Sequence, residues 1–136
     1  MGLKYTWDTN TVIYYLQNGL PPAGEELIDH ILDSHQPVIS VITEMELLCY
    51  RSASANEITL LSTFISNSAI YPLDEPVKLK AIEIRKSYRL KLPDAIIAAT
   101  ALVNNYILIS RNGADFNKIT ELKIIDPFNF SDDFII

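Results

Sequence analysis

The sequence predicts an α/β fold of three layers, in which a small, mostly parallel sheet lies between two layers of helices. Short apolar or β-branched runs alternate along the chain with longer segments whose apolar residues recur at helical spacing. This alternation is typical of a parallel sheet covered on both faces. In addition, residues 95–103 are apolar except for Thr100. A helix that is apolar on nearly every side is a buried one, so we expect a core helix there.

The chain has 136 residues, of which 49% are hydrophobic, and this is enough for one domain with its own core. No internal repeat, linker or low-complexity stretch interrupts it. We therefore expect residues 1–136 to form a single domain that ends in an apolar tail over 128–136. The tail is expected to pack on its own domain, on a neighbouring subunit or on a partner, because apolar side chains are costly to leave in water. Its apolar residues are Phe128, Phe130, Phe134, Ile135 and Ile136.

The chain is expected to begin with one strand and two helices. Residues 3–7 alternate apolar and polar side chains, as a strand does, and residues 8–10 end the run. Residues 11–17 are expected to form a short helix that ends at Asn18-Gly19. After a Pro-Pro loop, residues 23–35 carry leucines and isoleucines at helical spacing and predict a second helix.

A second strand and two more helices are expected next. Residues 37–41 are a short β-branched run, and a helix is expected from residue 43 to about 51. Residues 55–67 have helical spacing, with a face expected to be buried that consists of Ile58, Leu61, Phe64 and Ile65. The single cysteine, Cys49, cannot form an intrachain disulfide, and we expect it to pack as a small apolar side chain.

The second half of the chain is expected to continue the alternation. Residues 69–73 predict a strand, and Pro76 opens a helix with one face made of Val77, Ala81, Ile84 and Tyr88. Pro93 fits the first position of the core helix, where its missing N–H costs nothing. The remaining predicted elements are a strand over 106–110, a turn at Asn112-Gly113 and a short strand at 124–125.

Charge and hydropathy limit the classes of function. A net charge of −6 argues against a general nucleic-acid binder, whose surface is usually basic. Six of the 11 basic residues nevertheless lie between positions 78 and 91, so a local basic patch is expected. No apolar run approaches the ~20 residues of a membrane span, and no signal-peptide core appears at the start. We therefore expect a cytoplasmic protein without a membrane segment.

Four acidic residues fall where a parallel sheet would bring them together. In such sheets, ligands bind outside the carboxyl ends of the strands. The acids that lie after strands or open helices at this edge are Asp8, Glu46, Asp94 and Asp115. Carboxylates that converge repel each other unless they hold a cation, and hard oxygen ligands suit Mg²⁺ or Mn²⁺. A pair of such ions can activate a water and stabilise the leaving oxygen in phosphodiester cleavage.

Each of these acids also has a purely structural interpretation. Asp94 can simply stabilise the dipole of the core helix. Glu46 follows Thr43 at capping-box spacing, so it can bond to the backbone N–H of Thr43 instead of a metal. Asp8 with Asn10, and Asp115, can be turn or cap residues. These alternatives remain open from spacing alone.

Four segments of the chain resemble the PIN domain, and most closely its prokaryotic VapC-type toxins. The segments are 8–10 (Asp-Thr-Asn), 40–48, 92–101 and 110–116. They occur in the order and at the spacing typical of the family, and the resemblance covers nearly the whole chain. It implies a Mg²⁺- or Mn²⁺-dependent ribonuclease. It also implies a homodimer and a cognate antitoxin protein that blocks the site.

The resemblance assigns roles residue by residue. It implies that Asp8, Glu46, Asp94 and Asp115 are the catalytic, metal-holding acids, with Asn10, Ser110 and Asn112 as polar neighbours. Ser110 stands where many relatives have threonine, a departure that still supplies a hydroxyl. Candidates for contact with the RNA backbone are Arg85, Arg89, Lys91 and Arg111.

The sequence therefore predicts an endoribonuclease that is the toxin of a toxin–antitoxin pair. One alternative is a non-catalytic binding module with the same fold, which acts through protein or RNA contacts. A second is a phosphoacceptor receiver domain, another small acidic α/β protein. A receiver needs paired acids early in the chain, and Asp8 has no acidic neighbour.

Overall fold

The computed structural model describes residues 4–51 and 54–131. At its centre is a five-stranded sheet, parallel throughout, with the strand order β3-β2-β1-β4-β5. The strands are β1 (Tyr5–Trp7), β2 (Val38–Ser40), β3 (Ala69–Tyr71), β4 (Ile107–Ile109) and β5 (Ile124–Ile125). The predicted α/β class is confirmed. Because receiver domains have the order 2-1-3-4-5, the topology removes that alternative.

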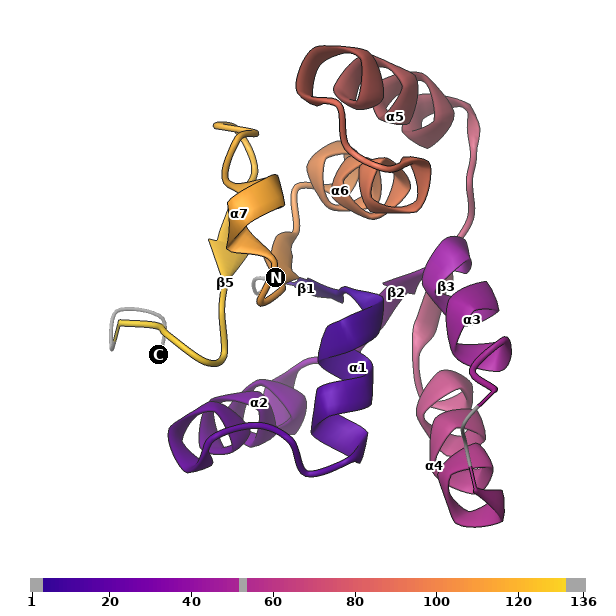
Figure 1. Cartoon of the computed structure of the whole chain (residues 1–136), viewed down its shortest axis with the longest axis vertical. Helices are drawn as coiled ribbons and strands as arrows, with labels where there is room; N and C mark the ends of the chain where they lie inside the picture. Colours follow the sequence, from indigo (N-terminus) through magenta and orange to yellow (C-terminus); the bar gives the residue numbers. More distant parts are fainter. Residues whose placement is uncertain (1–3, 52–53, 132–136) are drawn as a thin grey trace.

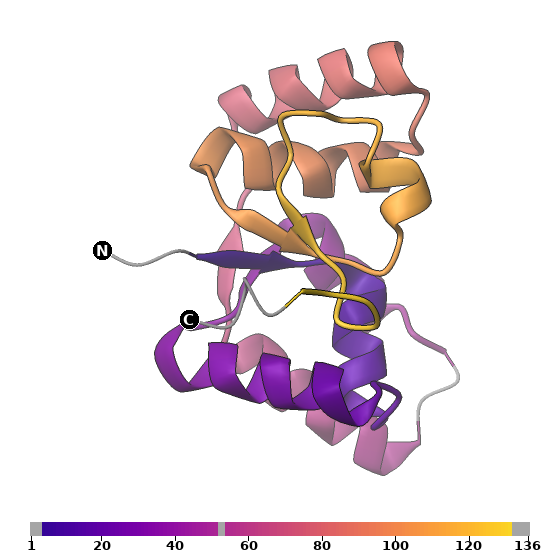
Figure 2. The same ribbon diagram turned by 90° about the vertical axis from the view of Figure 1, so that its left-hand side faces the viewer.

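Helices cover both faces of the sheet (Figures 1 and 2). They are α1 (Thr9–Leu16), α2 (Pro22–Ser34), α3 (Val41–Leu48), α4 (Ala55–Ser66), α5 (Glu75–Tyr88), α6 (Leu92–Asn104) and α7 (Gly113–Phe116). Helix α6 lies on one face with α5 outside it, and α1, α2 and α4 lie on the opposite face. No helix in the described ranges, 4–51 and 54–131, combines the length and apolar character needed to span a membrane.

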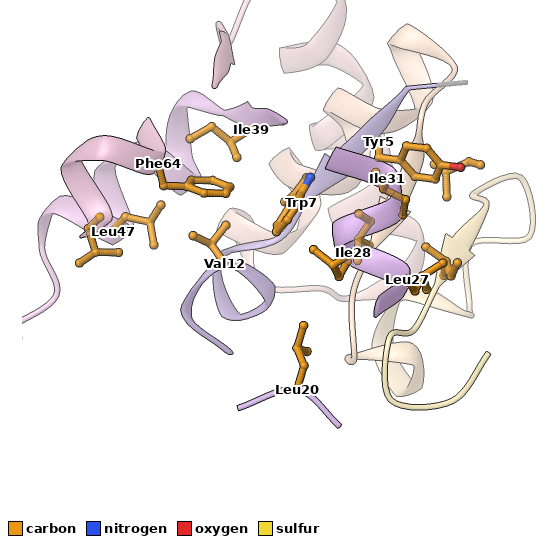
Figure 3. Packing of buried hydrophobic residues seen from close by; sticks show 14 residues of the cluster. Tyr5, Trp7, Val12, Leu20, Leu27, Ile28, Ile31, Ile39, Leu47 and Phe64 are labelled. Atoms are coloured by element: carbon orange, nitrogen blue, oxygen red, sulfur yellow. The ribbon is translucent and has the colours of Figure 1, made fainter. Parts of the chain in front are cut away.

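The core consists of two clusters, one on each face of the sheet. On the face of α1, α2 and α4, the fully buried Trp7 ring packs edge-on against Phe64 at 5.1 Å between centroids (Figure 3). On the other face, Leu108 packs against α6, in which every residue from 95 to 101 is buried. Alanines let this helix approach the sheet closely, and its predicted burial is confirmed.

The structure corrects several local predictions. Ile58 is 54% exposed, because the first turn of α4 projects beyond the core. Leu61 and Phe64 are buried as predicted, and Ile65 is partly buried against the same cluster. Cys49 is exposed rather than packed, since it ends α3 as the C-cap residue and only its backbone N–H is used. Pro93 occupies the second position of α6, after Leu92.

Part of the C-terminal tail packs on its own domain. Phe128 and Phe130 lie against the first core cluster. The carbonyl of Pro127 lies so close to α2 that a Cβ on Gly24 would approach its oxygen to 2.1 Å. Phe134, Ile135 and Ile136, and Leu3 of the first predicted strand, lie outside the described residues.

Candidate functional site

The candidate site lies where the strand order reverses. The chain passes from β1 to β2 and β3 on one side, and β4 and β5 lie on the other side of β1. Open parallel sheets bind ligands at the carboxyl edge of such a switch point. Asp8 directly follows β1, and the segment 110–115 follows β4, whose Ile109 is paired with Trp7. Both segments therefore reach the same edge, where β1 runs into α1 in Figure 2.

All four predicted carboxylates line one hollow of about 310 Å³ at this edge. Asp8 is the N-cap of α1, Glu46 comes from α3, Asp94 from the first turn of α6 and Asp115 from α7. The other lining residues are Thr9, Asn10, Lys91, Pro93, Ile97 and Asn112. The fold thus brings together acids that are up to about a hundred residues apart in the chain.

Asp8 is held more firmly than the other acids. The residue is 6% exposed. Its Oδ1 accepts a hydrogen bond from the backbone N–H of Thr11 at 2.8 Å, and its Oδ2 accepts one from Ser110 Oγ at 2.5 Å. The first bond caps α1, which begins two residues earlier than predicted. Burial raises the pKa of Asp8, although the hydrogen bonds from Ser110 and Thr11 oppose that shift. Asp8 is therefore both a helix cap and part of the hollow.

Glu46 bonds to a hydroxyl from another segment. Its Oε1 accepts a hydrogen bond from Thr9 Oγ1 at 2.6 Å, and Thr9 Oγ1 also lies 3.2 Å from Thr43 Oγ1. The capping box between Thr43 and Glu46, which was the structural alternative for this acid, does not form. Helix α3 begins earlier and is capped by Ser40, whose Oγ accepts the N–H of Ile42 at 3.2 Å. The Glu46 side chain is consequently directed to the hollow and not to its own helix end.

Asp94 is affected by the other three acids. It is partly buried in the first turn of α6. Burial raises its pKa, and repulsion from Asp8, Glu46 and Asp115 raises the pKa further, while Lys91 lowers it. The four carboxylates therefore share one electrostatic environment that is unfavourable when all are ionised.

Asn112 connects Asp115 to the strand end. Its Nδ2 donates to Asp115 Oδ2 at 3.1 Å, and its backbone N–H donates to Ser110 Oγ at 2.9 Å. Ser110 thus contacts both Asp8 and the loop of Asp115. The turn predicted at Asn112-Gly113 is instead the start of α7, because the amides of residues 115–117 bond back to Asn112 and Gly113. Asn10, the third predicted neighbour, is exposed at the rim.

Within residues 4–51 and 54–131, no three Asp, Glu, His or Cys side chains form a group that could hold a metal ion as they stand. Asp8, Glu46 and Asp115 are each bonded to a neighbouring hydroxyl or amide instead. The donor set nevertheless fits a hard divalent cation, because carboxylate oxygens are its preferred ligands and a cation would offset the repulsion around Asp94.

The four predicted RNA-contacting residues have different environments. Lys91 lines the hollow. Arg85 donates from Nη1 to the carbonyl oxygen of Leu90, so it supports the turn between α5 and α6. Arg89 is exposed in the left-handed conformation (φ 57°) that ends α5. Arg111 lies over the rings of Tyr14 and Phe128.

Sequence reasoning missed the roles of Thr9 and Thr11. Thr9 joins the first acidic segment to Glu46, and Thr11 holds Asp8 through its N–H while its Oγ1 donates to the carbonyl of Ile109 at 3.0 Å. The signal in the sequence was two threonines within three positions after Asp8, and hydroxyl residues are also typical of ordinary helix starts.

Comparison with solved structures finds chains of the same fold in toxin–antitoxin complexes. VapBC2 from Rickettsia felis, crystallised with a promoter DNA fragment, has a chain with a TM-score of 0.78 at 21% identity, over 91% of this chain and 98% of that one. DNA-bound VapBC from Salmonella typhimurium gives 0.78 at 25% identity, over 93% and 99%. A toxin–antitoxin complex from Klebsiella pneumoniae gives 0.70 at 28% identity, over 93% and 100%.

The sequence itself also matches a known family. No protein of curated function matches the chain. The family profile described as PIN domain, however, matches residues 5–122, which is most of the chain and contains all four acids. The resemblance to this family is therefore confirmed, and the structural neighbours include VapC toxins of VapBC complexes. The chain belongs to the PIN domain family.

Proposed function

We propose that this protein is a metal-dependent endoribonuclease and the toxin of a type II toxin–antitoxin pair. The observation that supports it best is the convergence of four carboxylates from four segments on one hollow at the β1–β4 switch point. PIN domains are typically nucleases and generally bind divalent metals. The choice of RNA as substrate rests on the likeness to VapC toxins.

Asp8, Glu46, Asp94 and Asp115 would hold Mg²⁺ or Mn²⁺. When bound, the ion would activate a water for attack on the phosphorus and stabilise the leaving oxygen. The neighbouring residues position these acids: Ser110 holds Asp8, Thr9 holds Glu46 and Asn112 holds Asp115. Lys91, at the wall of the same hollow, would attract the negatively charged phosphate.

No covalent intermediate on a protein side chain is needed. The hydroxyl of Ser110 contacts Asp8, but Ser110 is fully buried and its proton is donated to that carboxylate. The exposed Cys49 lies at the far end of α3 from Ser40 and does not line the hollow. Direct attack by water is therefore the favoured reaction.

Two kinds of protein partner are proposed, one from the relatives of this chain and one from its exposed apolar side chains. Relatives of this chain have been crystallised with antitoxin proteins, and we propose that a cognate antitoxin binds this one. We also propose a homodimer, because α3 and α5 leave large apolar side chains in solvent that a second copy would cover. These side chains are Met45, Leu48, Leu79 and Ile82. We propose that the protein acts on RNA in the cytoplasm.

The decisive experiment is incubation of the purified protein with several RNAs in Mg²⁺, Mn²⁺ or EDTA. Wild type should cleave only with metal, and Asp94→Asn should reduce cleavage more than about 100-fold, because a ligand is lost. In EDTA the variant should melt no lower than wild type, since one repelling charge is gone. Glu121→Gln, which neutralises an exposed acid away from the hollow, is the control and should cleave normally.

The same experiment tests the alternative of a non-catalytic binding module. Absence of cleavage by the folded wild type in either ion would favour that alternative. Full cleavage by a folded Asp94→Asn protein would remove Asp94 from the site and with it the proposed mechanism.

A further inference from the structure

We infer that Arg111, held over the rings of Tyr14 and Phe128, forms a phosphate-binding subsite for the RNA strand next to the acidic hollow. This inference rests on the proposed function and adds a second contact point for the substrate. It also gives the C-terminal segment a role at the candidate site.

The guanidinium of Arg111 has a defined position. Its Cζ lies 4.0 Å from the centroid of the Phe128 ring and 5.7 Å from that of Tyr14. The two rings contact each other edge-on, with centroids 5.2 Å apart and planes at 71°. Electron-rich ring faces attract a cation, so this pair fixes an otherwise flexible side chain.

This arrangement leaves the donors of Arg111 available. Among residues 4–51 and 54–131, no side chain or carbonyl forms a hydrogen bond or an ion pair with Arg111, and the residue is exposed. A guanidinium that stacks on a ring still presents its N–H groups at its edge, in the planar fork that fits two phosphate oxygens. A pre-positioned arginine of this kind loses little conformational entropy when it binds a phosphate.

A second hollow connects Arg111 to the acids. It measures about 300 Å³ and is lined by Asp8, Asn10, Tyr14, Arg111 and Asn112. Asp8, Asn10 and Asn112 also line the acidic hollow, so the two spaces adjoin. Lys91 lines only the acidic hollow, and Arg111 lines only the second one.

The charges favour a nucleic-acid strand over a small ligand in this pair of hollows. Four carboxylates would repel the phosphates that flank a scissile bond, and a cation beyond the acids offsets that repulsion for the neighbouring phosphate. The amides of Asn10 and Asn112 line both hollows and can donate to the sugar or phosphate.

Phe128 is a positioning residue for Arg111. Its backbone N–H donates to Asp126 Oδ1 at 2.8 Å, and the N–H of Asn129 donates to the Asp126 carbonyl at 3.0 Å, so a tight turn fixes the ring. The preceding Pro127 is pressed against Gly24 of α2. The segment 126–130 thus connects α2 to the edge of the candidate site.

The test is the binding of a fluorescent single-stranded RNA in EDTA, measured by anisotropy over a range of salt concentrations. Without metal, this measurement reports contact with the strand and not catalysis. Arg111→Gln should weaken binding about 10-fold and lower the slope of log K against log salt by about 0.7, the value for one phosphate contact on a single strand. Lys118→Ala, which removes another exposed cation of the same β4–β5 connection, should leave both unchanged.

Phe128→Leu tests the ring pair separately, since it keeps the charge and an apolar side chain. It should weaken binding less than Arg111→Gln does and leave the salt slope near that of wild type. In Mn²⁺, Arg111→Gln should raise KM about 10-fold with kcat within about twofold, as expected for a contact made before the reaction. Circular dichroism and the melting temperature confirm that each variant is folded.

The outcomes separate the two proposals. If wild type binds and cleaves RNA but Arg111→Gln does so equally well, the subsite is wrong and the proposed ribonuclease function stands. If Phe128→Leu binds RNA as tightly as wild type does, the proposed role of the Phe128 ring in positioning Arg111 is wrong. If wild type neither binds nor cleaves any RNA, both proposals are wrong.

Discussion

Thr9 is the residue whose single hydroxyl joins two acidic segments of the hollow. Its Oγ1 donates to Glu46 at 2.6 Å. Removing this donor in Thr9→Val keeps the side-chain shape but leaves Glu46 free to turn away. We expect cleavage to fall about 10–100-fold, the usual cost of losing a group that orients a metal ligand. The rate of RNA cleavage at a fixed Mn²⁺ concentration measures this loss.

Thr9→Ser is the matched control, because it keeps the hydroxyl and loses only a methyl group. It should restore most of the activity and the wild-type Mn²⁺ requirement. Equal loss in both variants would mean that the methyl group, and not the bond to Glu46, is what the site needs.

Asp8 provides a prediction about pH. Its pKa in the folded protein is raised above the ordinary 3.8, chiefly by burial. The folded state therefore binds this proton more tightly than the unfolded chain does, and the free energy of unfolding falls as the pH rises through the window above 3.8. In EDTA at pH 7, Asp8→Asn should melt higher than wild type, because the buried charge is absent while the amide can still pair with Thr11 and Ser110.

The difference in melting temperature between wild type and Asp8→Asn should disappear as the pH falls below 3.8, because Asp8 is then protonated in both the folded and the unfolded state. Melting curves of both proteins in EDTA across this range measure it, with Glu121→Gln as the control for a simple change of net charge. A lower melting temperature for Asp8→Asn at neutral pH would mean that the hydrogen bonds of the carboxylate outweigh its burial.

At the scale of the elements, α2 and the C-terminal segment meet without room for a side chain. A Cβ on Gly24 would lie 2.1 Å from the carbonyl oxygen of Pro127, so one of the two backbones must shift. We expect Gly24→Ala to lower the free energy of unfolding by about 1–3 kcal/mol, despite the better helix propensity of alanine. Chemical denaturation measures this change.

Gly113→Ala is a suitable comparison. There the added Cβ would approach only Asn117 Nδ2, the end of a flexible side chain, at 2.9 Å. This change should alter stability by no more than about 0.5 kcal/mol. Similar effects of the two substitutions would indicate that segment 126–130 yields easily and does not fix Phe128.

The elements with strong apolar patterns were predictable from the sequence, and their ends were not. Residues 95–101 are apolar except for Thr100, and α6 is buried as expected. Ile58 also has the right spacing, but spacing cannot tell how far along α4 the core extends. Likewise, Thr43 and Glu46 satisfy a capping-box pattern, but Ser40 caps α3 one turn earlier because the strand ends there.

At the scale of the whole molecule, the strand order decides which residues meet. Asp8 and Ser110 are 102 positions apart and share a hydrogen bond, because β1 and β4 are neighbours at the switch point. That acids following strands would share one edge could be predicted from the alternation of elements. The partner of each acid could not, because Thr9, Ser110 and Asn112 acquire their contacts only once strand order and helix ends are fixed.

The whole fold should respond to the metal. An ion that binds only the folded state stabilises it by RT ln(1 + [L]/Kd), which is about 2.7 kcal/mol when the ion is at about 100 times its Kd. For a domain of this size we expect millimolar Mn²⁺ to raise the melting temperature by roughly 5–15 °C. Ionised acids repel one another in the hollow, and a bound cation would also offset this repulsion and so stabilise the folded state further.

Two comparisons make this prediction specific. The same ionic strength supplied as NaCl should raise the melting temperature much less, since simple screening does not depend on a defined site. Asp8→Asn should respond to Mn²⁺ less than wild type, and Glu121→Gln should respond equally, because only the first change removes a carboxylate from the hollow. If Mn²⁺ stabilised all three proteins alike, the ion would be binding elsewhere. No stabilisation of wild type would mean that the four acids do not form a metal site in the isolated protein.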